Sequence, residues 1–265
     1  MEKMDIHQSP KAIFIALLTI LYAIVVLITG ILLIGTGSAA IVSSIAGALL
    51  VLTPLLLGIV SISEFARAGV AFGDRYSIMN TSSAFALCVL AIAEATFLTL
   101  QNFNPNDIAK VVYYVVASIG LLPWMASAVS YLRQSNEVLE FFSNRNLKKV
   151  LVLCAVLCPM PVILIMSTMI ENIGLAVIVT FYPLLTMTSL LLFTLGLISW
   201  IFRKGQLVKH ILCAFLGVCL LAMHFAIQSV SSTVILLAFN LLTGIEGYSL
   251  IGTSLLLAEA TADRA

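Results

Sequence analysis

Long apolar runs separated by short polar segments make up most of the chain. Each run reaches about 20 residues, which is the length a helix needs to cross about 30 Å of hydrocarbon. Lipid offers no hydrogen bonds to the backbone, so such a run has to be helical. We predict eight transmembrane helices, at about 12–35, 39–62, 83–101, 108–132, 149–169, 173–202, 207–228 and 233–257.

The composition supports a chain that lives in a lipid bilayer. Of the 265 residues, 62% are hydrophobic and 9% are charged, against about 25% charged residues in an ordinary soluble domain. A water-soluble fold of this size could not cover that much apolar surface. No basic stretch is long enough to follow a phosphate backbone, so we expect no nucleic-acid partner. The sequence predicts an all-α integral membrane protein with a single polytopic domain over residues 1–265.

Basic residues are distributed unevenly among the connections. The links that join the predicted helices in pairs carry one basic residue, Lys110, and the termini and the remaining loops carry the other 12 of the 13. Because cytoplasmic loops are rich in Lys and Arg, this asymmetry fixes the orientation. We therefore expect four hairpins in the cell membrane, with both termini in the cytoplasm.

Three ionisable side chains stand out within predicted membrane helices, away from their ends: Glu94, His224 and Glu246. Placing such a side chain at the centre of a membrane helix costs about 2.5–3.5 kcal/mol. We therefore expect each of the three to have a hydrogen-bonding partner or a function. The functional interpretation is a polar cavity that binds a ligand or carries protons. The alternative is that the carboxyls are protonated and hydrogen-bonded between helices.

Several hydroxyl and amide side chains share helical faces with these groups. Thr243, Ser249 and Thr253 form a stripe with Glu246 that we expect to face the bundle interior, while Tyr248 points elsewhere. The candidate ligand or proton residues are therefore Glu94, Glu246, Thr243, His224, Gln228, Tyr182 and Thr186.

Prolines recur in alternate predicted helices, at Pro54, Pro123 and Pro183. A proline removes a helix hydrogen bond and kinks the helix. The recurrence indicates four related hairpins around a widened cavity, although membrane helices also simply tolerate proline.

The usual sets of catalytic and cofactor-binding residues are missing from the sequence. Haem held by two histidines needs two embedded histidines, and we expect one, His224; a retinal Schiff base needs a lysine within a helix, and every lysine lies in a loop or at an end. No nucleotide, zinc-protease or serine-hydrolase motif is present. We therefore predict a protein without enzymatic activity, cofactor or metal.

One segment carries a family resemblance. The sequence Tyr182-Pro183-Leu184-Leu185-Thr186, which opens a long predicted helix, resembles the polytopic sensory domains of prokaryotic histidine kinases and cyclic-dinucleotide receptors. The family pattern has an aspartate three residues after the proline, where this chain has Thr186. The resemblance implies a sensory role without an output domain on this chain.

Our leading hypothesis is a sensory or regulatory membrane protein that contacts a partner protein through loops 63–82 and 133–148. The alternative is a secondary transporter or channel that uses the membrane glutamates, and a lipid-modifying enzyme is a third option. If Glu94 and Glu246 lie close together around a cavity, ligand or proton chemistry is favoured. If they lie far apart, each hydrogen-bonded to a neighbouring hydroxyl, structural pairing is favoured. The oligomeric state stays open.

Overall fold

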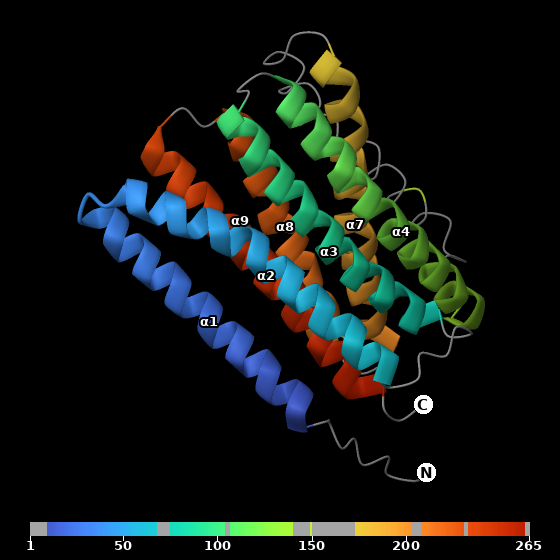
Figure 1. The fold of residues 1–265 in the computed structure, drawn as a ribbon. Helices are drawn as coiled ribbons and strands as arrows, with labels where there is room; N and C mark the ends of the chain where they lie inside the picture. Colours follow the sequence, from blue (N-terminus) through green and yellow to red (C-terminus); the bar gives the residue numbers. More distant parts are fainter. Residues whose placement is uncertain are drawn as a thin grey trace.

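The computed structural model describes residues 10–67, 75–103, 107–139, 149, 173–202, 208–230 and 233–262. These residues form long helices in a single bundle (Figure 1). The helices are α1 (Pro10–Gly35), α2 (Ala39–Arg67), α3 (Arg75–Phe103), α4 (Asp107–Leu139), α7 (Ile173–Phe202), α8 (Val208–Val230) and α9 (Val234–Ala262).

Within the described part of the chain, seven helices are long and apolar enough to cross a membrane. They coincide with seven of the eight predicted spans, which confirms the all-helical class. The remaining prediction, 149–169, lies outside the described residues apart from Lys149. Figure 1 shows α4 and α7 running in the same direction, so Leu139 and Ile173 lie toward opposite ends of the bundle.

Four helices extend five or more residues beyond their predicted ends. Helix α3 begins at Arg75 instead of residue 83, α2 continues to Arg67, α4 continues to Leu139, and α9 continues to Ala262. The segments 63–82 and 133–148, predicted as partner-binding loops, are therefore partly helical. The extra turns are more polar than the hydrocarbon-crossing windows, so a hydropathy criterion misses them.

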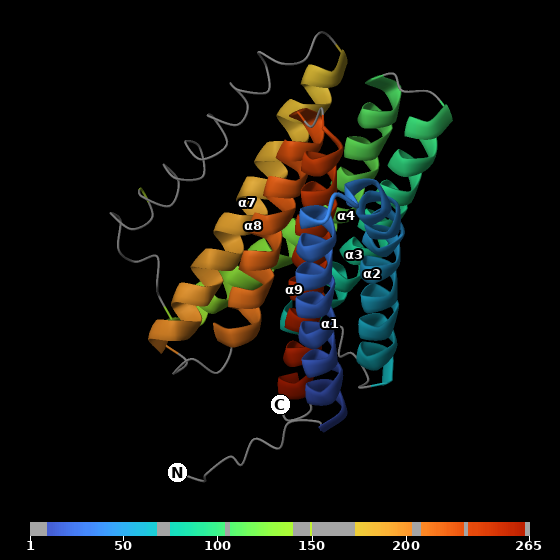
Figure 2. The ribbon, with the colours of Figure 1, turned by 90° about the vertical axis from the view of Figure 1, so that its left-hand side faces the viewer.

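Helix α9 lies at the centre of the bundle and packs against α1, α2, α3 and α8. Helix α1 is peripheral and contacts mainly α9 (Figure 2). The remaining helices complete the bundle through the pairs α2–α3, α3–α4, α4–α7 and α7–α8. Side chains on opposite faces of α9 therefore meet different groups of helices.

A tight turn joins α1 to α2. The amide of Gly37 donates to the carbonyl of Ile34 at 3.0 Å, and the amide of Ser38 donates to that of Leu33 at 2.9 Å. This pattern is the Schellman end of a helix, in which the residue after the cap is left-handed. Gly37 has a φ of 85°, a conformation that costs glycine little.

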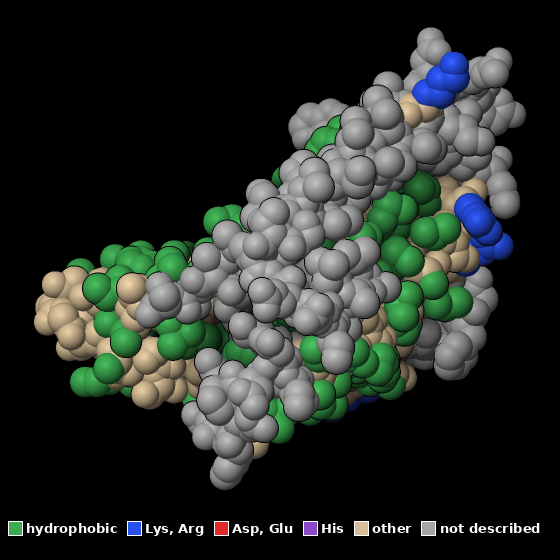
Figure 3. Space-filling model, turned by 90° about the horizontal axis from the view of Figure 1, so that it is seen from above, with side chains coloured by type: hydrophobic (Ala, Val, Ile, Leu, Met, Phe, Trp, Pro, Cys, Tyr) green, Lys and Arg blue, Asp and Glu red, His purple; other side chains and the backbone are tan. Residues whose placement is uncertain are grey.

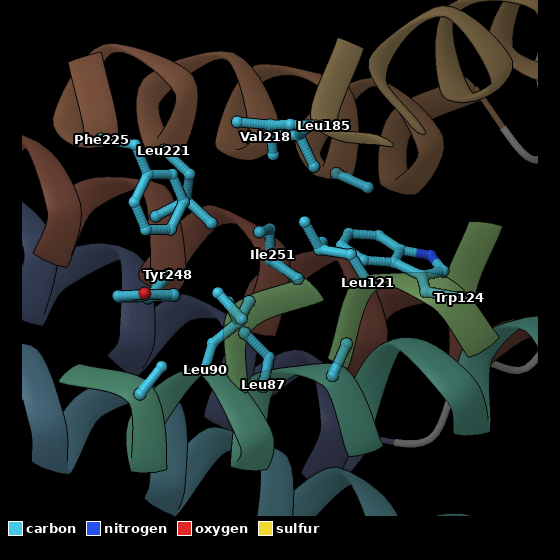
Figure 4. Packing of buried hydrophobic residues seen from close by; sticks show 14 of the residues in the cluster. Leu87, Leu90, Leu121, Trp124, Leu185, Val218, Leu221, Phe225, Tyr248 and Ile251 are labelled. Atoms are coloured by element: carbon cyan, nitrogen blue, oxygen red, sulfur yellow. The ribbon is translucent and has the colours of Figure 1, made fainter. Parts of the chain in front are cut away.

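Large apolar side chains occupy both the interior and the outer surface of the bundle. Figure 4 shows the interior cluster, in which Leu90 of α3, Leu121 of α4, Val218 of α8 and Ile251 of α9 belong to one core. The described surface is also largely hydrophobic when it is seen from one end (Figure 3). Such an exterior matches a lipid environment and would aggregate in water.

Candidate functional site

A single carboxylate oxygen joins four helices. Oε1 of Glu94, on α3, accepts a hydrogen bond from the Tyr113 hydroxyl of α4 at 2.7 Å and another from the Tyr248 hydroxyl of α9 at 2.8 Å. Nε2 of His224, on α8, lies 3.2 Å from the same oxygen. We call Glu94, Tyr113, His224 and Tyr248 the Glu94 cluster.

The second ring nitrogen of His224 fixes the position of one proton. Nδ1 lies 2.9 Å from the backbone carbonyl oxygen of Asn240 on α9. A carbonyl oxygen only accepts hydrogen bonds, so Nδ1 has to carry the proton. The remaining contact, between Nε2 and Glu94, then needs one further proton, on either the imidazole or the carboxyl group. Such a proton would be shared by Glu94 and His224, and the pair would then have no net charge in either arrangement.

The Glu94 cluster is sealed inside the bundle. The exposed fraction is 0% for Glu94, His224 and Tyr248 and 1% for Tyr113. The second carboxylate oxygen, Oε2 of Glu94, has no hydrogen-bond partner among the described residues, although it is buried. A buried carboxylate oxygen without a hydrogen-bond partner is unfavourable, so this atom is an unusual feature of the cluster.

Aromatic rings surround the cluster. The ring of Tyr113 lies 5.0 Å from Phe97 and 5.6 Å from Phe225, measured between ring centroids. Tyr248 is fully buried, and Figure 4 places it in the same apolar cluster as Phe225. These rings exclude water from the carboxylate, which strengthens its hydrogen bonds.

Glu246 does not join the Glu94 cluster. It stands two residues before Tyr248 and therefore about 200° away around α9. Its side chain is partly exposed, and its Oε1 atom has no hydrogen-bond partner among the described residues. The expectation that its whole stripe faces the interior is wrong in part, because Ser249 is buried whereas Glu246 is not.

The other candidate residues lie apart from Glu94. The hydroxyls of Thr243 and Thr186 donate to carbonyls of their own helices, at Phe239 and Tyr182, over 2.9 and 2.7 Å. Tyr182 is buried, and its ring lies 6.2 Å from that of Tyr114. The side chain of Gln228 lies outside the described residues.

A second histidine is buried, contrary to the expectation that His224 is the sole embedded one. His210 near the start of α8 is 2% exposed, and its Nε2 forms a hydrogen bond with the hydroxyl of Tyr76 on α3. The ring of Tyr76 also lies 5.4 Å from that of Tyr131 on α4. The predicted helix 207–228 contains His210, but the sequence analysis did not count this residue among the embedded ionisable side chains.

Sequence reasoning also missed the partners of Glu94. Tyr113 and Asn240 were not among the candidate residues, and Tyr248 was expected only to point away from the Glu246 stripe. The available signal was the helical offset: a polar aromatic residue at 200° from Glu246 has to face a different set of helices.

Comparison of the chain with protein-family models, with curated proteins and with solved structures found no match. The described helices have the length and composition of a polytopic membrane protein. The resemblance of the Tyr182–Thr186 segment to sensory domains stays a prediction from sequence.

Proposed function

We propose that this chain is a non-enzymatic sensory or regulatory membrane protein that responds to proton binding at the Glu94 cluster. One observation carries the proposal: a single buried oxygen of Glu94 accepts hydrogen bonds from helices α4 and α9 and lies 3.2 Å from Nε2 of His224 on α8. Any change in the protonation of this carboxyl group therefore changes contacts among four helices together.

The direction of the response follows from the hydrogen bonds. If the shared proton leaves, the lone pair of His224 Nε2 faces a carboxylate, and the contact between α3 and α8 becomes repulsive. If a further proton is added to Glu94, its oxygen has less capacity to accept, and a tyrosine hydroxyl loses its partner. The helix packing is thus bistable, as a switch requires.

We propose that the change in helix packing is transmitted to the polar ends of the helices. In the orientation that the basic residues favour, both termini and the 63–82 and 133–148 segments face the cytoplasm. The helical extensions at residues 63–67, 75–82 and 133–139 are then rigid continuations of α2, α3 and α4. We propose that a partner protein binds these helix ends and responds to the distance between them.

A distance measurement in lipid tests this proposal. Spin labels are placed at Phe85→Cys on α3 and Leu212→Cys on α8, two lipid-facing positions, in a variant without the native cysteines. We expect the distance between the labels to change with pH in the parent protein and to stay constant in Glu94→Gln. A Glu246→Gln variant is the matched control and should behave like the parent.

The transporter alternative predicts a different result. Purified protein in liposomes would carry a solute together with protons, detected with a pH-sensitive dye inside the vesicles. Coupled flux that disappears in Glu94→Gln, with no stable partner co-purified from native membranes, would replace the sensory proposal. A pH-independent label distance in the parent protein would remove the proton-responsive proposal itself.

A further inference from the structure

Polar side chains join three helices at the end of the bundle where α3 and α8 begin. Nη1 of Arg75, the first residue of α3, donates to the backbone carbonyl of Ser130 on α4 at 3.2 Å. The next residue, Tyr76, is hydrogen-bonded to His210 of α8, and its ring lies 5.4 Å from that of Tyr131 on α4. Figure 1 shows the start of α3 and the end of α4 at the same end of the bundle. These contacts hold the Arg75 side chain against α4.

This end of the bundle coincides with the ends of the apolar spans. Arg75 is the first residue of the span on α3, the span on α4 ends at Ser135, and that on α8 begins at Lys209. Tyr76 and Tyr131 have aromatic rings with polar tips, which favour the headgroup region of a bilayer. We therefore expect the Arg75 guanidinium at the level of the lipid headgroups, on the cytoplasmic side in the orientation that the basic residues favour.

A second guanidinium belongs to the same turn of α4. Arg133 follows Ser130 by three residues, and residues with this spacing are neighbours on one helix face. A helix carbonyl points along the axis toward the residue four positions further on, so the carbonyl of Ser130 holds Arg75 beside the turn that carries Arg133. Arg75 is half-buried and Arg133 is exposed. Both cations can therefore reach one group outside the bundle.

Neither arginine has a carboxylate partner among the acidic side chains that the structure describes. These are Glu64, Glu94 and Glu246. Glu64 pairs with Arg67 at 2.6 Å, and the other two are the membrane glutamates, well inside their helices. The carbonyl of Ser130 is a neutral acceptor and uses one of the five N–H groups of Arg75. Within the described part of the chain, a half-buried positive charge is thus held in place without a counter-charge.

The surroundings favour a ligand that has both an anionic head and an apolar tail. A guanidinium presents its N–H groups as a planar fork that matches the oxygens of a phosphate. Exposed apolar side chains continue from this end into the bilayer on all three helices, at Phe85 of α3, Leu122 of α4 and Leu212 of α8. Anionic lipids are concentrated in the cytoplasmic leaflet, and basic residues between membrane helices on that side bind their headgroups.

We propose that Arg75 and Arg133 bind the phosphate group of an anionic phospholipid. Arg75 provides a guanidinium that the Ser130 carbonyl has already positioned, and Arg133 provides an exposed one at the rim. The bond between Tyr76 and His210 fixes the start of α3 beside α8 and so supports the site. The Glu94 cluster takes no part in it, so this proposal and the proposed function can fail separately.

Native mass spectrometry of lipid binding tests the proposal. The purified protein in detergent is titrated with phosphatidylglycerol or with phosphatidylcholine of the same acyl chains, and the fraction that carries one lipid is measured. We expect the parent protein to bind phosphatidylglycerol at least several-fold more tightly. Arg75→Gln should lose this preference and Arg133→Gln should reduce it. Lys11→Gln, which removes an exposed cation at the start of α1, is the matched control and should keep it.

Thermal unfolding separates lipid binding from a merely structural role of Arg75. A ligand that binds the folded state raises Tm, so phosphatidylglycerol should raise the Tm of the parent more than phosphatidylcholine does. Arg75→Gln should lose that difference, whatever its Tm without lipid. Arg75→Lys, which keeps the charge without the planar fork, should retain part of it.

Four results would overturn the proposal. The first is equal binding of the two lipids by the parent, including the case in which a preference emerges only in Asp74→Asn or Glu137→Gln, since one of those carboxylates then neutralises the arginines. The second is a preference that survives in the Arg75→Gln/Arg133→Gln double variant. The third is an equal loss in Lys11→Gln, which would indicate diffuse attraction. The fourth is displacement of phosphatidylglycerol by millimolar inorganic phosphate, which would identify free phosphate as the ligand.

Discussion

Glu246 and Tyr248 are two residues apart on α9, and their side chains point to opposite sides of that helix. The Tyr248 hydroxyl donates to Glu94 of α3 at 2.8 Å, whereas the Glu246 side chain is partly exposed and its Oε1 atom has no hydrogen-bond partner among the described residues. The two membrane glutamates therefore belong to separate sites. One site is sealed and ties helices together, and the other is partly exposed and has no basic partner on the described parts of α1, α2 and α9.

Removal of one hydroxyl from the Glu94 cluster should weaken the bundle. Tyr248→Phe keeps the ring and deletes the hydrogen bond to Glu94, so we expect the free energy of unfolding to fall by about 1 kcal/mol. Thr96→Val is the control, since the Thr96 hydroxyl is exposed and donates only to the Ile92 carbonyl of its own helix, at 2.7 Å. Equal losses in the two variants, measured by denaturant titration in detergent, would contradict the assignment.

The interface between α8 and α9 should not accept a larger residue at Gly217. An added Cβ would lie 2.7 Å from the carbonyl oxygen of Gly247, which is backbone and cannot rotate away. Gly217→Ala should therefore destabilise the protein by about 1–3 kcal/mol through overpacking. Gly35→Ala is the matched control, because its Cβ would meet open space. Thermal unfolding that is unchanged in Gly217→Ala would show that the helices are farther apart.

Gly244 holds space for the imidazole ring of His224. A Cβ at this position would lie 2.9 Å from Nδ1 of His224 and 2.5 Å from Cδ1 of Leu50. Gly244→Ala should displace the ring from the Asn240 carbonyl and abolish the pH-dependent distance change between α3 and α8. Gly196→Ala, whose Cβ makes an ordinary 3.6 Å contact with Ile211, should retain that change. A normal response in Gly244→Ala would exclude His224 from the switch.

The orientation of the chain can be checked by cysteine accessibility. Thr36, in the exposed turn between α1 and α2, should be outside the cell, and Arg67, at the far end of α2, should be inside. In cells with a cysteine-free background, a membrane-impermeant maleimide should label Thr36→Cys at once and Arg67→Cys only after permeabilisation. The reverse order would invert the topology that the basic residues predict.

Hydropathy was enough to place the described helices but not to find their ends. Helix α3 starts eight residues before its predicted span, in a stretch that contains Arg75 and Tyr76. These residues lower the local hydropathy, yet the helix persists there because they have tertiary partners. Arg75 donates to the Ser130 carbonyl of α4 at 3.2 Å, and Tyr76 bonds to His210 of α8. A hydropathy window counts apolar residues and therefore cannot detect such tertiary partners.

The sequence identified Glu94 and His224 as unusual but did not pair them. They are 130 positions apart, and Tyr248 is 154 positions from Glu94. Their meeting depends on how each helix is rotated in the bundle, and periodicity alone cannot fix that rotation when nearly every face is apolar. For the same reason Glu94 and Glu246 were considered for one cavity, although Glu94 meets α9 at Tyr248 and Glu246 points to the other side of that helix.

The proton shared by Glu94 and His224 is the central claim of this account, and nitrogen-15 NMR of histidine-labelled protein in bilayers tests it most directly. The signal of His224 is assigned by its loss in His224→Gln. We predict a protonated Nδ1 in His224 and an Nε2 signal that shifts strongly in Glu94→Gln. An unprotonated Nδ1, or an Nε2 signal that is identical in the parent and in Glu94→Gln, would contradict the claim.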